Sequence, residues 1–131
     1  MKINRVTLSL ALLFLWGCVG ACDGLEENHR PRLHSLIANP DSLDGSGDST
    51  TVVCVATDPD GDRLVFDWIT DARLIIKGVN PNQNHLYNSP NNTQVFYRSA
   101  VAAFDDSGWV QCYARDRRGM SASRLIIVTV R

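Results

Sequence analysis

Three carboxylates in one short turn are the residues of this sequence best suited to hold a metal ion. Asp58, Asp60 and Asp62 alternate with a proline and a glycine, and calcium prefers about six to eight oxygen ligands of this kind. An EF-hand loop begun at Asp58 would need glycine sixth and glutamate twelfth, yet Arg63 and Ile69 occupy those places. Two interpretations remain: a calcium site of another kind, or a turn whose Asp side chains accept hydrogen bonds from local amides while arginines offset the charge. We favour the turn.

A second group of chemically capable residues lies near the C-terminus. Trp109, Tyr113 and Arg115 share one face of an expected strand, opposite Cys112. Exposed aromatic rings beside an arginine suit a protein interface or a sugar-binding platform, because they bury a large area at a small entropic cost. The alternative is that loops cover these residues as a minor core.

Catalytic chemistry has little support in the sequence. His29, His34 and His85 fall in separate segments, and none recurs at the spacing of a zinc protease. The sequence also contains no nucleophile elbow. A formal charge of -1 without a basic helix argues against nucleic-acid binding. We therefore expect a non-enzymatic protein with no nucleic-acid partner.

The N-terminus has the three-part layout of a secretory signal peptide. Lys2 and Arg5 precede an apolar run from Leu8 to Trp16, and small residues follow. The alternative is an uncleaved membrane anchor, but the run is shorter than the roughly 20 residues that cross a bilayer. We expect residues 1–21 to be removed.

The cleavage region resembles the lipobox of bacterial lipoproteins. Residues 19–22 read Val-Gly-Ala-Cys, whereas Cys18 follows the bulky Trp16 and fits that pattern less well. The resemblance implies that Cys22 receives the lipid and that its acyl chains, palmitate among them, hold the protein at the membrane. By resemblance to enterobacterial lipoproteins, Asp23 would retain the protein on the periplasmic face of the inner membrane. Outside that group, the choice between inner and outer membrane stays open.

The remaining cysteines form a pair. Cys18 would leave with the signal peptide and Cys22 would carry lipid, so Cys54 and Cys112 are left on two strand-like segments. An exported compartment is oxidising, and we expect a disulfide between them. The alternatives are two buried free thiols or a metal-binding pair, although the close spacing and histidine partners of a zinc site are missing.

The mature chain predicts a short tether followed by one β-rich domain. Residues 22–31 are polar and suit a tether, and residues 32–131 are long enough for a single sandwich. Alternation places Leu64, Phe66 and Trp68 on one inward face. We expect a loop over 78–93, leave 99–107 open between loop and helical turn, and predict strands over 33–38, 51–57, 63–69, 73–77, 94–98, 109–115 and 123–131.

These elements resemble an immunoglobulin-type module. A cysteine, an inward tryptophan and a second cysteine appear in the order of immunoglobulin domains. More closely, residues 56–62 (Ala-Thr-Asp-Pro-Asp-Gly-Asp), the strand 64–68, and Ala-Arg-Asp at 114–116 with Gly119 resemble bacterial PKD-type and cadherin-like modules over 31–131. One departure is Val110, which stands where antibody domains have a corner tyrosine.

The resemblance implies an all-β, immunoglobulin-like Greek-key sandwich. In that fold the loops after the second and sixth strands share one end. Asp116 would then lie beside the acidic turn as a further calcium ligand. Calcium is the one cofactor that the sequence suggests.

We expect a lipid-anchored protein of the cell envelope on the extracytoplasmic or periplasmic face of a membrane. Its single module would bind or support another protein without catalysis. The alternatives are a calcium-assisted carbohydrate-binding module, and an enzyme inhibitor or accessory subunit.

Overall fold

The structure, a computed structural model, describes residues 26–103 and 105–131. The expected signal peptide and Cys22 lie outside these residues. The described residues form strands and no helix, so they contain no helical segment with the length and hydropathy to cross a membrane. The strands are β1 Arg32–Asn39, β2 Ser42–Leu43, β3 Ser49–Thr57, β4 Val65–Thr70, β5 Leu74–Ile76, β6 His85–Ser89, β7 Thr93–Arg98, β8 Asp106–Arg115 and β9 Ser121–Val130.

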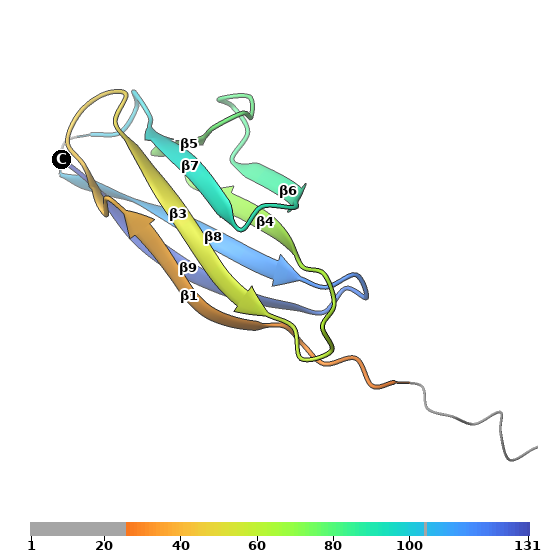
Figure 1. The fold of residues 1–131 in the computed structure, drawn as a ribbon. Helices are drawn as coiled ribbons and strands as arrows, with labels where there is room; N and C mark the ends of the chain where they lie inside the picture. Colours follow the sequence, from red (N-terminus) through yellow and green to blue (C-terminus); the bar gives the residue numbers. More distant parts are fainter. Residues whose placement is uncertain (1–25, 104) are drawn as a thin grey trace, which may run out of the picture.

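Two sheets pack face to face as the layers of a sandwich (Figure 1). One has the strand order β1-β3-β7-β5 and the other β2-β9-β8-β4-β6. The strand pairs of the described residues are antiparallel except that of β2 with β9, which is parallel. After β4 the chain crosses to the four-stranded sheet as β5, returns as β6 and crosses again as β7. The prediction of an all-β, immunoglobulin-like sandwich is confirmed.

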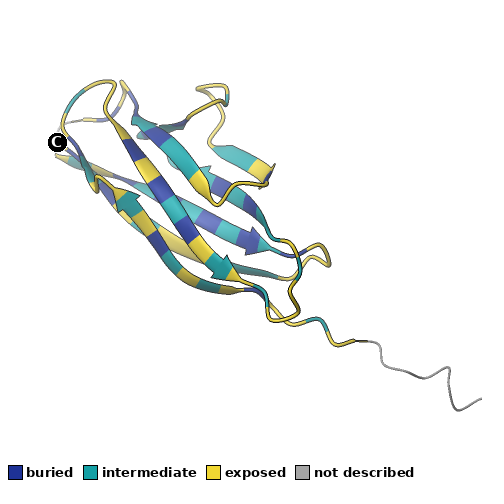
Figure 2. Ribbon diagram, viewed as in Figure 1, coloured by how far each residue is buried: buried dark blue, intermediate teal, exposed yellow. Residues whose placement is uncertain are grey.

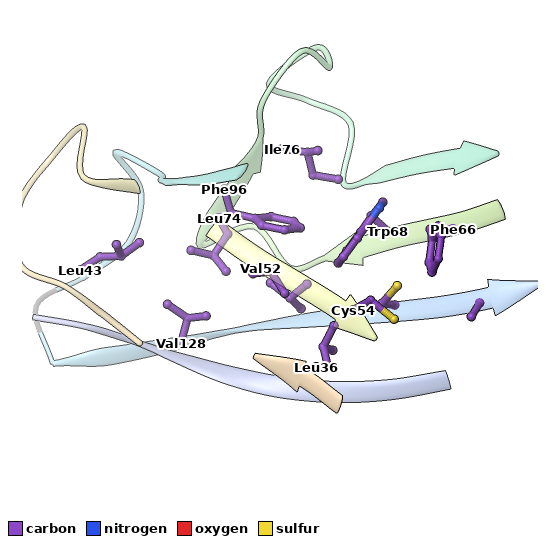
Figure 3. Packing of buried hydrophobic residues seen from close by; sticks show 13 residues of the cluster. Leu36, Leu43, Val52, Cys54, Phe66, Trp68, Leu74, Ile76, Phe96 and Val128 are labelled. Carbon is purple, nitrogen blue, oxygen red and sulfur yellow. The ribbon is translucent and has the colours of Figure 1, made fainter. Parts of the chain in front are cut away.

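The core follows from the alternation of apolar residues along β3, β4 and β8 (Figure 2). Cys54, Trp68, Val110 and Cys112 are fully buried, as the period of two predicts. The Trp68 ring meets the edge of Phe96 with ring centroids 6.0 Å apart, a favourable aromatic geometry. Figure 3 shows these side chains filling the space between the sheets. Burying each large apolar side chain stabilises the fold by about 1.5–3 kcal/mol.

Three predictions about local structure need correction or completion. The expected loop 78–93 contains strand β6, and the two-residue β2 was not anticipated. The segment 99–107 forms no helical turn at its described positions, and β8 begins within it at Asp106. Asn and Pro residues around β6 lower its intrinsic β propensity, so its strand depends on pairing with the edge of β4.

The tether enters the sandwich at one end, and the C-terminus lies at the other (Figure 1). The entry end carries the β3–β4 loop, residues 58–64, and the β8–β9 turn, residues 116–120. We call these two segments the loop end.

Candidate functional site

The outer face of the five-stranded sheet carries neighbouring apolar and aromatic side chains outside the core. Because Trp68 and Cys112 point inward and pair across β4 and β8, their neighbours along each strand point outward. The register then aligns outward residues in rows across the strands. The outer face consists of Val65, Asp67 and Ile69 on β4, His85 and Tyr87 on β6, Trp109, Gln111, Tyr113 and Arg115 on β8, and Leu125 and Ile127 on β9.

Three residues of this outer face are large, apolar and strongly exposed. Leu125, Ile127 and Tyr87 expose 47%, 57% and 54% of their surface. Ile127 lies opposite Trp109 across the β8–β9 pair, and the Tyr87 ring stacks on His85 with centroids 4.7 Å apart. The exposed side chains therefore continue into aromatic neighbours, which is the arrangement that marks an interaction surface rather than scattered exposure.

The predicted surface residues Trp109, Tyr113 and Arg115 all lie on this outer face, but they are half-buried. Strands β4 and β9 flank β8 and shield them on both sides. Arg115 is also held by its neighbours. Its Nε and Nη2 atoms each lie 3.2 Å from a carboxylate oxygen of Asp67, and Nη2 donates to Asn88 Oδ1 at 2.7 Å. The hydrogen bond with Asp67 raises the pKa of Arg115.

The Arg115–Asp67 pair leaves the outer face without net charge. The other residues of this face, His85 aside, are apolar, aromatic or an amide, with Ser121 and Ser123 of β9 beside Arg115 and Tyr113. Sequence reasoning missed Leu125, Ile127, His85 and Tyr87. The unbroken apolar run of β9 is typical of a strand buried on both sides, and β6 was expected to be loop.

The acidic turn is organised by its own backbone. Asp58 Oδ1 accepts hydrogen bonds from the amides of Asp60 and Asp62 at 2.9 and 3.2 Å. The carboxylate of Asp62 lies 3.1 Å from Arg117 Nε. Gly61 has φ 74°, the left-handed conformation that glycine adopts without strain. The side chains therefore act within the turn and toward the neighbouring arginine.

Asp116 organises the opposite half of the loop end. It is buried, and its carboxylate accepts hydrogen bonds from the amides of Arg118 and Met120 at 2.8 and 2.9 Å and from Asn28 Nδ2 at 2.9 Å. Burial alone raises the pKa of Asp116, but these hydrogen bonds outweigh burial and hold the pKa below its ordinary value.

The four acids predicted as calcium ligands thus share one end of the sandwich, and each has amide, histidine or arginine partners of its own. Within residues 26–103 and 105–131, no three His, Cys, Asp or Glu side chains converge closely enough to hold a metal ion. The four acids lie in hydrogen-bonded turns, and the calcium site stays a prediction.

The tether is docked on the loop end, which the sequence did not predict. The His29 amide donates to Asp60 Oδ2 at 2.6 Å, and His29 Nδ1 lies 2.8 Å from Asp60 Oδ1. Arg118 Nη1 donates to the carbonyl of Glu26 at 3.3 Å. The hydrogen bond and charge of Asp60 raise the pKa of His29, Glu27 raises it further and Arg32 opposes them. The same contact lowers the pKa of Asp60.

Cys54 and Cys112 meet at the centre of the core. They come from β3 and β8 in different sheets. Cys112 pairs with Trp68 across β8 and β4, and Figure 3 shows Cys54 close to Trp68. Both are thiols in this structure. Their mutual hydrogen bond and burial raise the pKa of Cys112. The pair has the placement that the sequence predicted, and the disulfide itself stays a prediction.

Comparisons with known proteins extend the structural result. No family model matches the chain, and no curated protein matches it. Among solved structures, a nucleoside hydrolase-related hypothetical protein from Saccharophagus degradans is similar, with a TM-score of 0.51 and 20% identity over 79% of this chain. The chain spans only 26% of that protein.

Two further structures have lower TM-scores. The PKD1 domain of Vibrio anguillarum Epp has a TM-score of 0.48 at 14% identity, and the match covers 79% of this chain and 96% of that one. A lipoprotein from Bacteroides thetaiotaomicron has a TM-score of 0.48 at 16% identity, with 79% and 82% covered. At such identities, likeness concerns the fold alone. The chain is an immunoglobulin-like β-sandwich.

Proposed function

We propose that this protein is a lipid-anchored, non-enzymatic module of the cell envelope that binds a partner protein through the outer face of its five-stranded sheet. One observation carries the proposal: Leu125, Ile127 and Tyr87 are strongly exposed beside aromatic neighbours on one neutral surface. Leaving such side chains in water is unfavourable, and a partner that covered them would gain about 25 cal/mol for each Å² of apolar surface removed from water.

The chemistry of the outer face favours a protein over a sugar. Leu125 and Ile127 are aliphatic, and aliphatic side chains pack against other apolar side chains but offer a sugar no hydrogen bonds. The Arg115–Asp67–Asn88 network lies beside this apolar area and supplies polar groups of the kind found at an interface rim.

Carbohydrate binding is the second candidate, and the stacked His85–Tyr87 pair favours it. A flat aromatic surface beside the polar atoms of Arg115 and Asn88 has the mixed character of many small-ligand sites. Calcium would have no direct part in this binding, because the acidic residues lie at the loop end and not on the outer face. Binding of the soluble domain to a glycan array would favour this candidate.

The membrane anchor is proposed from residues 19–22 and the preceding apolar run. Replacing Cys22 by Ser in the full-length precursor is expected to release the protein from the membrane pellet. An unchanged membrane fraction would contradict lipidation at this residue.

The partner is tested by crosslinking in the native cell from a photoreactive amino acid at Leu125, followed by mass spectrometry. The recovered protein is then purified and its affinity measured for the double variant Leu125→Ser/Ile127→Ser. The matched control is Val55→Ser/Ile37→Ser, because these residues lie on the four-stranded sheet and expose 46% and 59% of their surface.

Loss of two buried anchors is expected to weaken binding at least about tenfold, which corresponds to about 1.4 kcal/mol. The control variant should change the affinity by less than about twofold, since surface substitutions outside an interface cost little. Equal losses in both variants, or no loss in the first, would refute the assignment of the outer face.

A further inference from the structure

We infer that the docked tether keeps the loop end of the sandwich close to the membrane and excludes the inverted orientation. The inference rests on the proposed lipid anchor at Cys22. It names an interaction surface that the anchor alone does not imply, because a flexible tether would allow the domain to take any orientation.

The contacts come from three tether residues and reach both segments of the loop end. His29 binds Asp60 of the β3–β4 loop through its amide and its ring. Asn28 donates to the buried Asp116 of the β8–β9 turn at 2.9 Å. The carbonyl of Glu26 accepts from Arg118 of the same turn. Two of these contacts involve a carboxylate, and such charge-assisted hydrogen bonds are stronger than neutral ones.

The loop end is also pre-organised for contact with the tether. Two amides of its own turn already hold the Asp116 carboxylate in place, so the contact with Asn28 costs little conformational entropy. Pro31 is buried where the tether joins β1, and its ring restricts the direction in which the chain leaves the sandwich. The residues at both ends of the docked segment, Asp116 of the β8–β9 turn and Pro31 before β1, are therefore held in place before docking.

Docking shortens the chain between lipid and domain. Three residues lie between Cys22 and Glu26, the first docked residue, and the four Cα-to-Cα steps across them span at most about 14 Å. If the tether were free as far as Arg32, ten residues could span about 36 Å.

This difference decides which orientations are accessible. Strands β8 and β9 have 10 residues each and run between the two ends of the sandwich, so the body is roughly 33 Å long. An inverted domain would lift the loop end about that far from the membrane. A free tether reaches this height, but a docked tether does not. Docking therefore removes the inverted orientation and leaves the outer face accessible from the side.

The test uses the mature, lipidated full chain in vesicles of phosphatidylcholine containing a gadolinium-chelating lipid. Amide NMR signals near a gadolinium ion broaden, so the broadening of Gly61 and Gly119 at the loop end is compared with that of Gly47 at the opposite end. In the native chain we expect the loop-end amides to relax at least about tenfold faster, given ends roughly 33 Å apart.

The variant Asn28→Ala/Asp60→Ala removes the amide and ring contacts of His29 and the contact of Asn28, and both residues lie outside the core. It is expected to reduce this ratio at least about threefold, because the free chain can span about 36 Å. The control His34→Ala removes an exposed imidazole of β1 whose ring hydrogen-bonds Thr57 in its own sheet, and should keep the native ratio.

Equal broadening at both ends of the native, vesicle-bound chain would overturn the inference while leaving the anchor intact. An unchanged ratio in the double variant would show that docking does not set the orientation and would overturn it as well. A chain that fails to sediment with the vesicles would contradict the anchor, and the inference would fall with it.

Discussion

Reduction of the Cys54–Cys112 pair is expected to cost this domain a large part of its stability. The two thiols hydrogen-bond each other in the core, and we expect oxidation after export to join them. The bond would close a loop of roughly 58 residues. Constraining a loop of that length in the unfolded chain stabilises the native state by about 4 kcal/mol in the chain-entropy description. Small domains have a total of only about 5–15 kcal/mol.

The assay is urea unfolding of the mature domain, followed by tryptophan fluorescence, with and without a phosphine reductant. A loss of about 4 kcal/mol at a slope near 2 kcal/mol/M lowers the midpoint by about 2 M. The control is Cys54→Ala/Cys112→Ala, which has no thiol to oxidise. Its midpoint should be lower than that of the oxidised domain and should not respond to reductant.

Two results would refute this reasoning. Detection of two reactive thiols in the denatured, unreduced protein would show that the pair stays reduced, in agreement with the alternative of two buried free thiols. An intact disulfide whose reduction left the urea midpoint unchanged would show that loop closure contributes nothing to stability here.

Three further predictions concern the loop end and the sheet packing. The contact between His29 and Asp60 raises the pKa of His29 and lowers the pKa of Asp60. The contact is therefore expected to be lost when the pH rises above the pKa of His29 or falls below the pKa of Asp60. An NMR titration of His29 that Asp60→Asn left unchanged would contradict this. Gly108→Ala is expected to lower the free energy of unfolding by about 1–3 kcal/mol, because the added Cβ would lie 2.9 Å from Leu74 Cγ; an unchanged urea midpoint would show that Leu74 adjusts freely. Millimolar calcium is expected to leave the melting temperature unchanged, because Asp58 and Asp116 each already accept two hydrogen bonds from local amides; a rise would reveal a site.

Strand alternation made much of the fold predictable. Trp68 and Cys112 are buried because every second residue of a strand faces the same side. The same rule placed Trp109, Tyr113 and Arg115 together on the opposite face. Their half-buried state was not predictable, since it depends on which strands flank β8.

Strand β6 and the exposure of β9 show where local signals are insufficient. The sequence around His85–Ser89 is rich in Asn and Pro, and such residues weaken β propensity. The strand forms because the edge of β4 offers hydrogen bonds. In β9 the run 125–128 is apolar throughout, and only the packing of one sheet face decides that Leu125 and Ile127 meet solvent.

The sequence by itself determined the alternating core, the acidic turn and the cysteine pair that the sandwich brings together. Each of these depends on residue type and on the period of two along a strand. Only the tertiary structure decided that the tether docks on the loop end and that one sheet carries the neutral outer face. Asn28 and Asp116 are 88 residues apart, and no local pattern encodes a hydrogen bond between two segments that meet only after both sheets have formed.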